Sequence, residues 1–243
     1  MRIRRPTKSL TVAAFIMMLG AAFSTTLIIR GTAPAADSRA DSGTFVLKLA
    51  GHEYGTEKFS LDISSKQVTV KSESQLKDVS SGQMIRTTSR LVLDDSLNPQ
   101  TYTWFDKGPE KFDLSVNFAT SPAKSTLHRP TGKNDVREFQ LPRNVLVLDN
   151  NVIVHYQVLL DRFAAAGGGK QIFQAFIPQS ALPGSLTIQD AGTQTTTLGG
   201  IERQLRHVVV LSDNAQIDLW MDDANRLQRL YWSAPQIEAV RQP

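Results

Sequence analysis

Residues 148–169, LDNNVIVHYQVLLDRFAAAGGG, carry the clearest helical pattern in the chain. Apolar side chains recur along this stretch at the spacing of a helix, so that they fall on one stripe. The stripe predicts an amphipathic helix over residues 149–166 that buries one face. The residues of the stripe are Val152, Tyr156, Leu159, Leu160 and Phe163.

Both ends of this helix are marked in the sequence. Asp149 or Asn150 is expected to cap the N-terminus, because a side-chain oxygen can accept a hydrogen bond from a free backbone N–H of the first turn. Gly167–Gly169 are expected to end the helix, since glycine accepts the left-handed C-cap conformation. The β-branched run Val152–Val154 leaves a strand as the competing interpretation. A single amphipathic helix cannot bury its stripe alone, so the pattern requires a sheet beneath it.

The remainder of the chain is dominated by β patterns. Apolar and polar residues alternate most regularly over Phe112–Phe118, and similar alternation occurs in Thr44–Ala50. Ile85–Leu93 is a longer strand candidate that stops at Asp94-Asp95. Successive strands with one intervening helix indicate a mostly antiparallel sheet. We therefore expect a mainly β (α+β) fold, a curved sheet or half-barrel packed on one central helix, in a single β-rich domain over residues 44–243. Residues 120–133 and the Thr-rich residues 192–200 are expected to be loops.

Two segments share the pattern of a strand, an Asp-Asp pair and a return strand. Leu93 precedes Asp94 in the first segment, and Met221 precedes Asp222 in the second. An aspartate at a turn accepts hydrogen bonds from nearby backbone N–H groups, so both segments are expected to be ordinary hairpins. The second segment lacks the central glycine and the bidentate glutamate of a calcium loop.

The first 35 residues have the pattern of an export signal. A basic start is followed by an apolar run over residues 10–29 and then by the small residues Ala33-Pro34-Ala35. This order predicts a cleaved signal peptide, with an uncleaved N-terminal membrane anchor as the alternative. Residues 36–43 are expected to be a flexible linker. Either interpretation places the domain outside the cytoplasm, in the periplasm or the extracellular space, or anchored in the inner membrane by residues 10–29.

Charge and cysteine content exclude several classes of function. The sequence has 27 Lys and Arg and 23 Asp and Glu, but five of the basic residues lie within residues 1–35, which contain no acid. The expected mature domain therefore has no basic excess to attract nucleic acid. The chain has no cysteine, which excludes disulfides, thiol catalysis and cysteine–zinc sites.

The pattern resembles the periplasmic half-barrels of the LolA/LolB lipoprotein-carrier type, over about residues 44–240. A leader, a Gly-bounded turn (Gly51, Gly55), the hairpins at Leu93-Asp94 and Met221-Asp222, and one central helix carry the resemblance. It is similar also to poorly characterised exported proteins of that shape. The resemblance implies a curved sheet covered by helices, with an apolar space that takes lipid chains. This sequence departs from that pattern because it has one clear helix, and no family motif identifies ligand residues.

No catalytic or metal-binding motif is present. The histidines His52, His128, His155 and His207 have no partner at metal-ligand spacing. The chain also has no G-x-S-x-G motif and no glycine-rich phosphate loop that opens a helix. We therefore expect no catalytic residue, no metal and no cofactor, and a binding protein rather than an enzyme. A hydrolase built from scattered Asp, His and Ser residues is the third hypothesis.

The aromatic residues are the candidates for a ligand site, with an ordinary hydrophobic core as the alternative. Neighbours on a strand point to opposite faces, so Trp104-Phe105 and Tyr231-Trp232 each place an aromatic side chain on both faces of the sheet. A second layer, a ligand or a partner must then cover the second face. The predicted ligand-binding residues are Trp104, Tyr156, Leu159, Phe163, Trp220 and Trp232.

Two hypotheses about function follow from these patterns. The first is an exported, non-catalytic binding or carrier protein for an apolar small molecule or lipid, which would lie between the sheet and the helix. The alternative is a membrane-anchored assembly or interaction module that presents a sheet edge or its aromatic face to another envelope protein. An uncleaved leader, which would be the only contact with the membrane, would strengthen the second hypothesis.

Overall fold

The structure is a computed structural model. The expected leader, including its apolar run, lies outside the described residues. Within the described part, no helix is both long enough and apolar enough to cross a bilayer. The described residues are 40–78, 81–108, 111–130, 132–212, 215–234 and 236–243.

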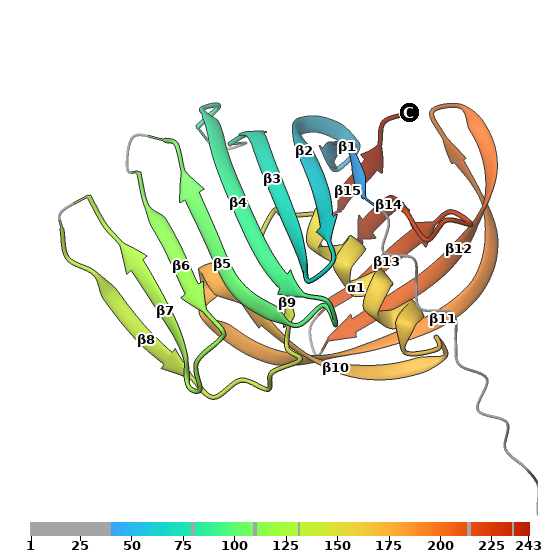
Figure 1. The fold of residues 1–243 in the computed structure, drawn as a ribbon. Coiled ribbons are helices and arrows are strands. Elements are labelled where there is room, and N and C mark those ends of the chain that lie inside the picture. Colours follow the sequence, from blue (N-terminus) through green and yellow to red (C-terminus); the bar gives the residue numbers. More distant parts are fainter. Residues whose placement is uncertain (1–39, 79–80, 109–110, 131, 213–214, 235) are drawn as a thin grey trace, which may run out of the picture. The chain divides into compact units, whose positions relative to one another are not determined.

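The described residues form one continuous 15-stranded sheet that curves around a single α-helix (Figure 1). The N-terminal strands are β1 (Asp41–Leu49), β2 (His52–Ser64), β3 (Gln67–Lys77), β4 (Met84–Asp94), β5 (Pro99–Asp106), β6 (Asp113–Asn117), β7 (Ala123–His128), β8 (Asp135–Phe139) and β9 (Leu146–Val147). The elements that follow are α1 (Val154–Ala165), β10 (Lys170–Ile177), the 3-10 helix η1 (Pro178–Ser180), β11 (Leu182–Leu198), β12 (Ile201–Ser212), β13 (Ala215–Met221), β14 (Leu227–Trp232) and β15 (Ile237–Arg241).

The order of the strands explains how the chain encloses its helix. From β1 the chain runs outward, strand by strand, to β8 at one edge of the sheet. It then passes through β9 and α1 to β10 and returns, strand by strand, to β15, which pairs with β1. The β9–β10 pair is parallel and the other described pairs are antiparallel. The mainly β fold with one central helix is therefore confirmed.

The helix lies in the concave side of the sheet and is buried on most of its circumference. Leu159, Leu160 and Phe163 have no exposed surface. They pack in one core with inward-facing strand residues such as Leu47 and Leu219. Burying each side chain of this size contributes about 1.5–3 kcal/mol, so the inner face of the sheet and the helix stabilise each other.

The helix begins later than the sequence predicts. It starts at Val154, and its N-cap, Ile153, makes no side-chain capping bond. The expected caps, Asp149 and Asn150, lie upstream of this point, so the N-cap prediction is wrong. The C-terminal prediction is confirmed, because Gly167 follows the helix at a φ of 88° and its N–H donates to Ala164 O at 2.9 Å.

Three boundaries differ from the expected ones. Asp41–Gly43, expected to end the flexible linker, belong to β1, where Arg241 holds Asp41 through bonds of 2.8 and 2.6 Å. Strand β7 lies within the expected loop 120–133, because its short, partly polar pattern gives a weak β signal. Strand β11 runs to Leu198, so most of the expected Thr-rich loop is a strand, which agrees with the β preference of threonine.

The two Asp-containing hairpins form as expected. Asp94 Oδ1 accepts from the backbone N–H groups of Ser96 and Asn98, at 3.0 and 2.8 Å. Asp222 Oδ1 makes the equivalent bonds to Ala224 and Arg226 N–H, at 3.0 and 2.9 Å. In both hairpins the aspartate therefore stabilises its own turn.

A second layer covers part of the outer face of the sheet. The long β11–β12 hairpin brings Leu198 and Leu205 onto Trp220 of β13, and Tyr231 and Val240 pack against this cluster. Tyr231 thus faces outward while its neighbour Trp232 packs against the inner core. The opposite orientation of neighbouring aromatic residues, and the need for a covering layer, are both confirmed in this hairpin region.

Aromatic contacts join the far ends of the sheet. Phe139 of the edge strand β8 packs on Phe176 of β10 with ring centroids 4.8 Å apart. Phe118 meets the same ring edge-on at 6.2 Å. The curved sheet is therefore held closed on this side by side-chain packing.

Candidate functional site

A cavity of about 830 Å³ lies on the inner side of the sheet, beside the N-terminal end of α1. We call it the inner cavity. Its walls are residues 148–153, the first turns of α1 and strands β10 to β15. Most of the lining side chains are apolar; they include Val152, Ile177, Val210, Ile217, Leu230 and Ile237.

Two of the predicted ligand-binding residues line the inner cavity. Tyr156 reaches it from α1, and burial raises the pKa of its hydroxyl to about 12. Trp232 reaches it from β14, and its buried indole N–H has no acceptor within the described part of the chain. The cavity therefore combines an apolar wall with two aromatic side chains that each carry a polar group.

The other predicted residues lie elsewhere. Leu159 and Phe163 are in the closed core and do not line the inner cavity. Trp220 lies on the outer face under the β11–β12 hairpin. Trp104 lines a different pocket, described below. The apolar stripe of the helix thus divides into a part that faces the cavity and a part that the core encloses.

A buried carboxylate, that of Asp149, stands at the edge of the inner cavity. Its Oδ2 accepts from the Tyr102 hydroxyl at 2.6 Å, and its Oδ1 accepts from the backbone N–H groups of Asn150 and Gln179, at 3.0 and 3.1 Å. Burial raises the pKa of Asp149, and these bonds oppose the shift. Both oxygens are engaged, so Asp149 holds the wall of the cavity in place.

His155 supports the same segment from the helix. Its Nδ1 accepts from the backbone N–H of Asp149 at 3.2 Å, and its ring meets the Tyr102 ring edge-on at 5.5 Å. Burial lowers the pKa of His155 to about 3, so the ring is neutral at ordinary pH. Its Nε2 has no partner among the described residues. His155 therefore holds the backbone at Asp149 in position, and its buried ring does not exchange protons with solvent.

Glu57 of β2 provides the cap that the helix lacks locally. Its fully buried carboxylate accepts from the backbone N–H groups of Ile153 and Val154, at 2.8 and 3.4 Å. An anion is stabilised at this end of a helix by the helix dipole. Burial nevertheless raises the pKa of Glu57 to about 7. The bonds from Ile153 and Val154, and one with Ser72, lower the pKa but do not cancel the effect of burial.

Sequence reasoning missed Glu57, although a signal was present. Glu57 stands two and four residues before Phe59 and Leu61, in the inward positions of an alternating strand. A carboxylate in such a position must have a buried partner. The pattern could therefore have identified a buried polar site, although not the helix that it caps.

A second pocket of about 370 Å³ lies on the inner face of β5–β8. We call it the Arg129–Arg137 pocket. Trp104, Leu114 and Leu127 form its apolar floor, and η1 forms one side. Gln179 of η1 lines both this pocket and the inner cavity, so the two spaces meet at that residue.

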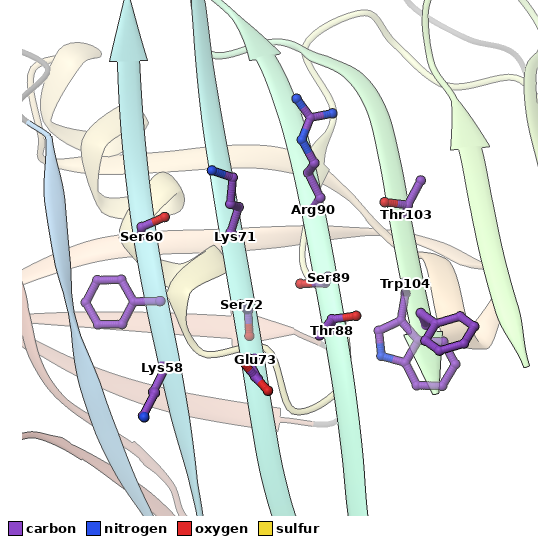
Figure 2. A pocket seen from close by; sticks show the side chains of 12 residues that line it. Lys58, Ser60, Lys71, Ser72, Glu73, Thr88, Ser89, Arg90, Thr103 and Trp104 are labelled. Carbon is purple, nitrogen blue, oxygen red and sulfur yellow. The ribbon is translucent and has the colours of Figure 1, made fainter. Parts of the chain in front are cut away.

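A third depression, of about 480 Å³, is on the outer side of β2–β5 (Figure 2). The strand register places Ser60, Lys71, Arg90 and Thr103 in one row across it. Lys71 already pairs with Asp62 at 2.7 Å. Most of its lining residues are polar or charged, so it is a weaker candidate for an apolar ligand than the inner cavity.

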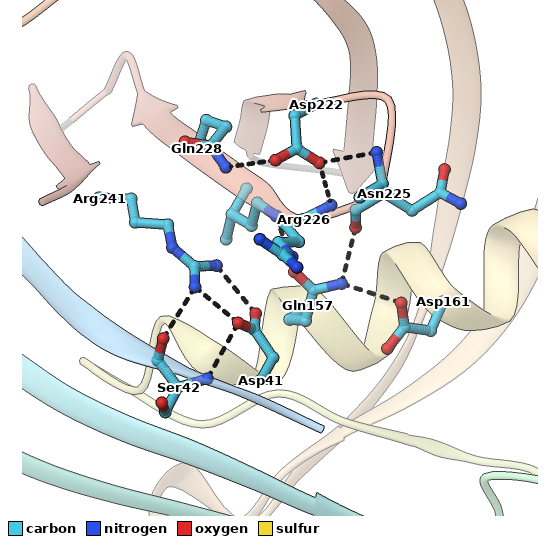
Figure 3. A network of polar contacts seen from close by, with 11 residues as sticks. Asp41, Ser42, Gln157, Asp161, Asp222, Asn225, Arg226, Gln228 and Arg241 are labelled. Atoms are coloured by element: carbon cyan, nitrogen blue, oxygen red, sulfur yellow. Dashed lines mark hydrogen bonds and ion pairs between the residues drawn. The ribbon is translucent and has the colours of Figure 1, made fainter. Parts of the chain in front are cut away.

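A polar network anchors the middle of the helix (Figure 3). Gln157 donates to Asp161 Oδ1 and Asn225 O, both at 2.8 Å, and accepts from the backbone N–H of Leu227 at 2.7 Å. Burial raises the pKa of Asp161 to about 6. The network ties α1 to the β13–β14 turn and so fixes the helix against the wall of the inner cavity.

No family model matches this sequence, and no curated protein matches it. A β-barrel-like protein of the domain of unknown function DUF1849 from Brucella abortus is similar in structure, with a TM-score of 0.51 and 9% identity, over 83% of this chain and 94% of that chain. A DUF1089 family protein from Pseudomonas aeruginosa has a TM-score of 0.46 and 12% identity, over 74% and 90%. The first likeness shows a β-barrel-like fold. It does not establish the expected relation to LolA/LolB carriers.

Proposed function

We propose that this protein is a non-catalytic binding or carrier protein for an apolar or lipid-like ligand. The inner cavity is the binding site, with Tyr156 and Trp232 in contact with the ligand. We propose further that the domain works in the periplasm or the extracellular space, with residues 1–35 as its export segment. The barrel-like fold, shared with domains of unknown function, is compatible with a binding role.

The composition of the inner cavity carries this proposal. Its volume of about 830 Å³ falls within the common range for ligand pockets, about 300–1,000 Å³. Asp149 is the one charged residue among the described lining residues, and its oxygens are already bonded. A charged group inside would lose its hydration without a new partner, whereas an apolar group gains about 25 cal/mol for each Å² that it buries.

Gly184 offers a direct way to fill the cavity. It lies in β11 and lines the inner cavity, and a Cβ added there meets no atom within 4 Å. We expect Gly184→Trp to fold normally and to weaken binding of the fluorescent apolar probe N-phenyl-1-naphthylamine by at least about tenfold, which is about 1.4 kcal/mol. The matched control is Thr103→Trp in the outer depression, which should bind the probe as the parent does. Equal probe affinity in all three proteins would exclude the inner cavity as the site.

A sheet edge supports the alternative function as an envelope interaction module. Strand β8 is the last strand of the sheet order, and β7 is its one paired neighbour in the described sheet. Val136 on this strand is half exposed. Such an edge can accept a strand from a partner protein. Cross-linking in intact cells through a photoreactive residue at Val136 tests this alternative, and native mass spectrometry of the envelope protein reports both its bound mass and the fate of residues 1–35.

A further inference from the structure

We infer that the ligand is an amphiphile with an anionic head group, which lies with its apolar part in the inner cavity and its head at Arg129 and Arg137. This inference rests on the proposed function and specifies the ligand class. It follows from the position and charge of the Arg129–Arg137 pocket.

The strand register directs Arg137 toward the inner face. Ser125 is buried on this face, and Arg137 is directly opposite it on β8. Directly opposed residues of an antiparallel pair project to the same side of the sheet. The full row across β5–β8 is Tyr102, Val116, Ser125 and Arg137.

The two spaces are adjacent and share one partition. Gln179 lines both, and η1, to which it belongs, packs against β6. Asn150 lines the inner cavity and donates through Nδ2 to the hydroxyl of Ser180, which lines the Arg129–Arg137 pocket, at 3.0 Å. A molecule that is longer than the inner cavity would have to pass η1 to reach the arginines.

The positively charged side chains lie in only one of the two spaces. The described lining of the inner cavity includes no Lys or Arg. The Arg129–Arg137 pocket contains both arginines and one acid, Asp135. Arg137 pairs with Asp135 at 2.9 Å, but the two side chains are 58% and 37% exposed, and such surface pairs contribute little.

Arg129 is the more available cation. It lies 5.7 Å from the centroid of the Phe112 ring, and it makes no ion pair with an acid in the part of the chain that the structure describes. A guanidinium binds carboxylate and phosphate oxygens through two parallel hydrogen bonds. A carboxylate or phosphate head at the open pocket would also remain close to water, so its desolvation cost would be small.

Displacement of N-phenyl-1-naphthylamine from the full-length protein tests the inference. Dodecanoate and dodecyl phosphate should each compete at least about tenfold better than methyl dodecanoate, a difference of about 1.4 kcal/mol. The double variant Arg129→Ala/Arg137→Ala should remove this difference and leave the affinity for the methyl ester unchanged. The control Arg90→Ala, in the outer depression, should retain it.

The outcomes separate this inference from the proposed function. If the acids and the ester compete equally, and the double variant changes neither, the head-group inference is wrong while the apolar site stands. If inorganic phosphate alone displaces the probe as well as dodecyl phosphate does, the pocket binds free anions and not an amphiphile. If the probe does not bind at all, or if none of the alkyl compounds displaces it, the proposed function fails together with the inference.

Discussion

Trp220 and Trp232 lie on neighbouring strands, β13 and β14, but on opposite faces of the same sheet. Trp220 faces outward, donates through Nε1 to Gln194 Oε1 at 3.1 Å, and stacks on His207 with ring centroids 4.8 Å apart. The guanidinium of Arg229 covers the Trp220 ring at 4.6 Å. Trp232 instead lines the inner cavity, and no described residue accepts from its indole N–H.

The difference shows that an apolar face does not by itself mark a binding site. On the outer face, the chain supplies its own cover through the end of the β11–β12 hairpin, where Leu198 and Leu205 pack on Trp220. On the inner face, the helix fills only part of the concavity and leaves the inner cavity beside its N-terminal end. The two tryptophans therefore have different tasks, one structural and one proposed for ligand binding.

Substituting each tryptophan with alanine should have the largest effects, on stability at Trp220 and on ligand affinity at Trp232. Trp220→Ala removes a well-packed ring, so we expect a loss of about 3–5 kcal/mol in the free energy of unfolding with unchanged affinity for the apolar probe. Trp232→Ala should lose less stability, because its ring borders a cavity, but should weaken probe binding by about tenfold or more. Urea unfolding and fluorescence titration measure the two quantities. Reduced probe affinity in folded Trp220→Ala would contradict the division.

The sequence predicted the elements with strong local signals. Alternating strands such as Phe112–Phe118 and the glycines after the helix depend on neighbours in sequence, and these features are present. The start of the helix was missed because its cap, Glu57, is 96 residues away from Ile153. A prediction from the local pattern favoured Asp149, which binds Tyr102 across 47 residues instead.

The candidate site was predictable only in part, for a similar reason. Tyr156, Leu159 and Phe163 belong to one apolar stripe, and their residue types do not reveal which of them faces open space. That outcome depends on how deeply the helix sits in the sheet, which β3, β14 and the Gln157 network determine. Strand geometry did predict that one aromatic side chain of each neighbouring pair faces outward. The β11–β12 hairpin covers Tyr231, whereas Phe105 of β5 remains 38% exposed.

The inner face also contains a fully buried carboxylate, that of Glu57. Burial raises the pKa of Glu57 from 4.5 to about 7, so the folded state retains a proton that the unfolded state releases. The stability contributed by this proton is present below pH 4.5 and is lost as the pH rises through about 7. The difference amounts to about 3 kcal/mol.

Glu57→Gln should therefore become more stable relative to the parent as the pH rises from 4.5 to 8, by up to about 3 kcal/mol. Urea unfolding at several pH values measures the difference between the two proteins. The lowered pKa of His155 destabilises both proteins equally as the pH falls below 6.5. This contribution therefore cancels when the stability of the variant is compared with that of the parent. A constant difference over this range would mean that Glu57 is not protonated in the fold near neutral pH.

The smallest expected effect concerns the two indole N–H groups. Trp220→Phe removes the bond to Gln194 and leaves its ring contacts largely in place, so we expect a loss of about 1 kcal/mol in the free energy of unfolding. Trp232→Phe removes a buried donor that has no described acceptor, and the relief of that donor offsets part of the packing lost with the smaller ring. Its loss in stability should accordingly be smaller than that of Trp220→Phe. A larger loss at Trp232, measured without ligand, would mean that the inner face holds its tryptophan as firmly as the outer face does, and the proposed division of tasks between the two faces would have to be abandoned.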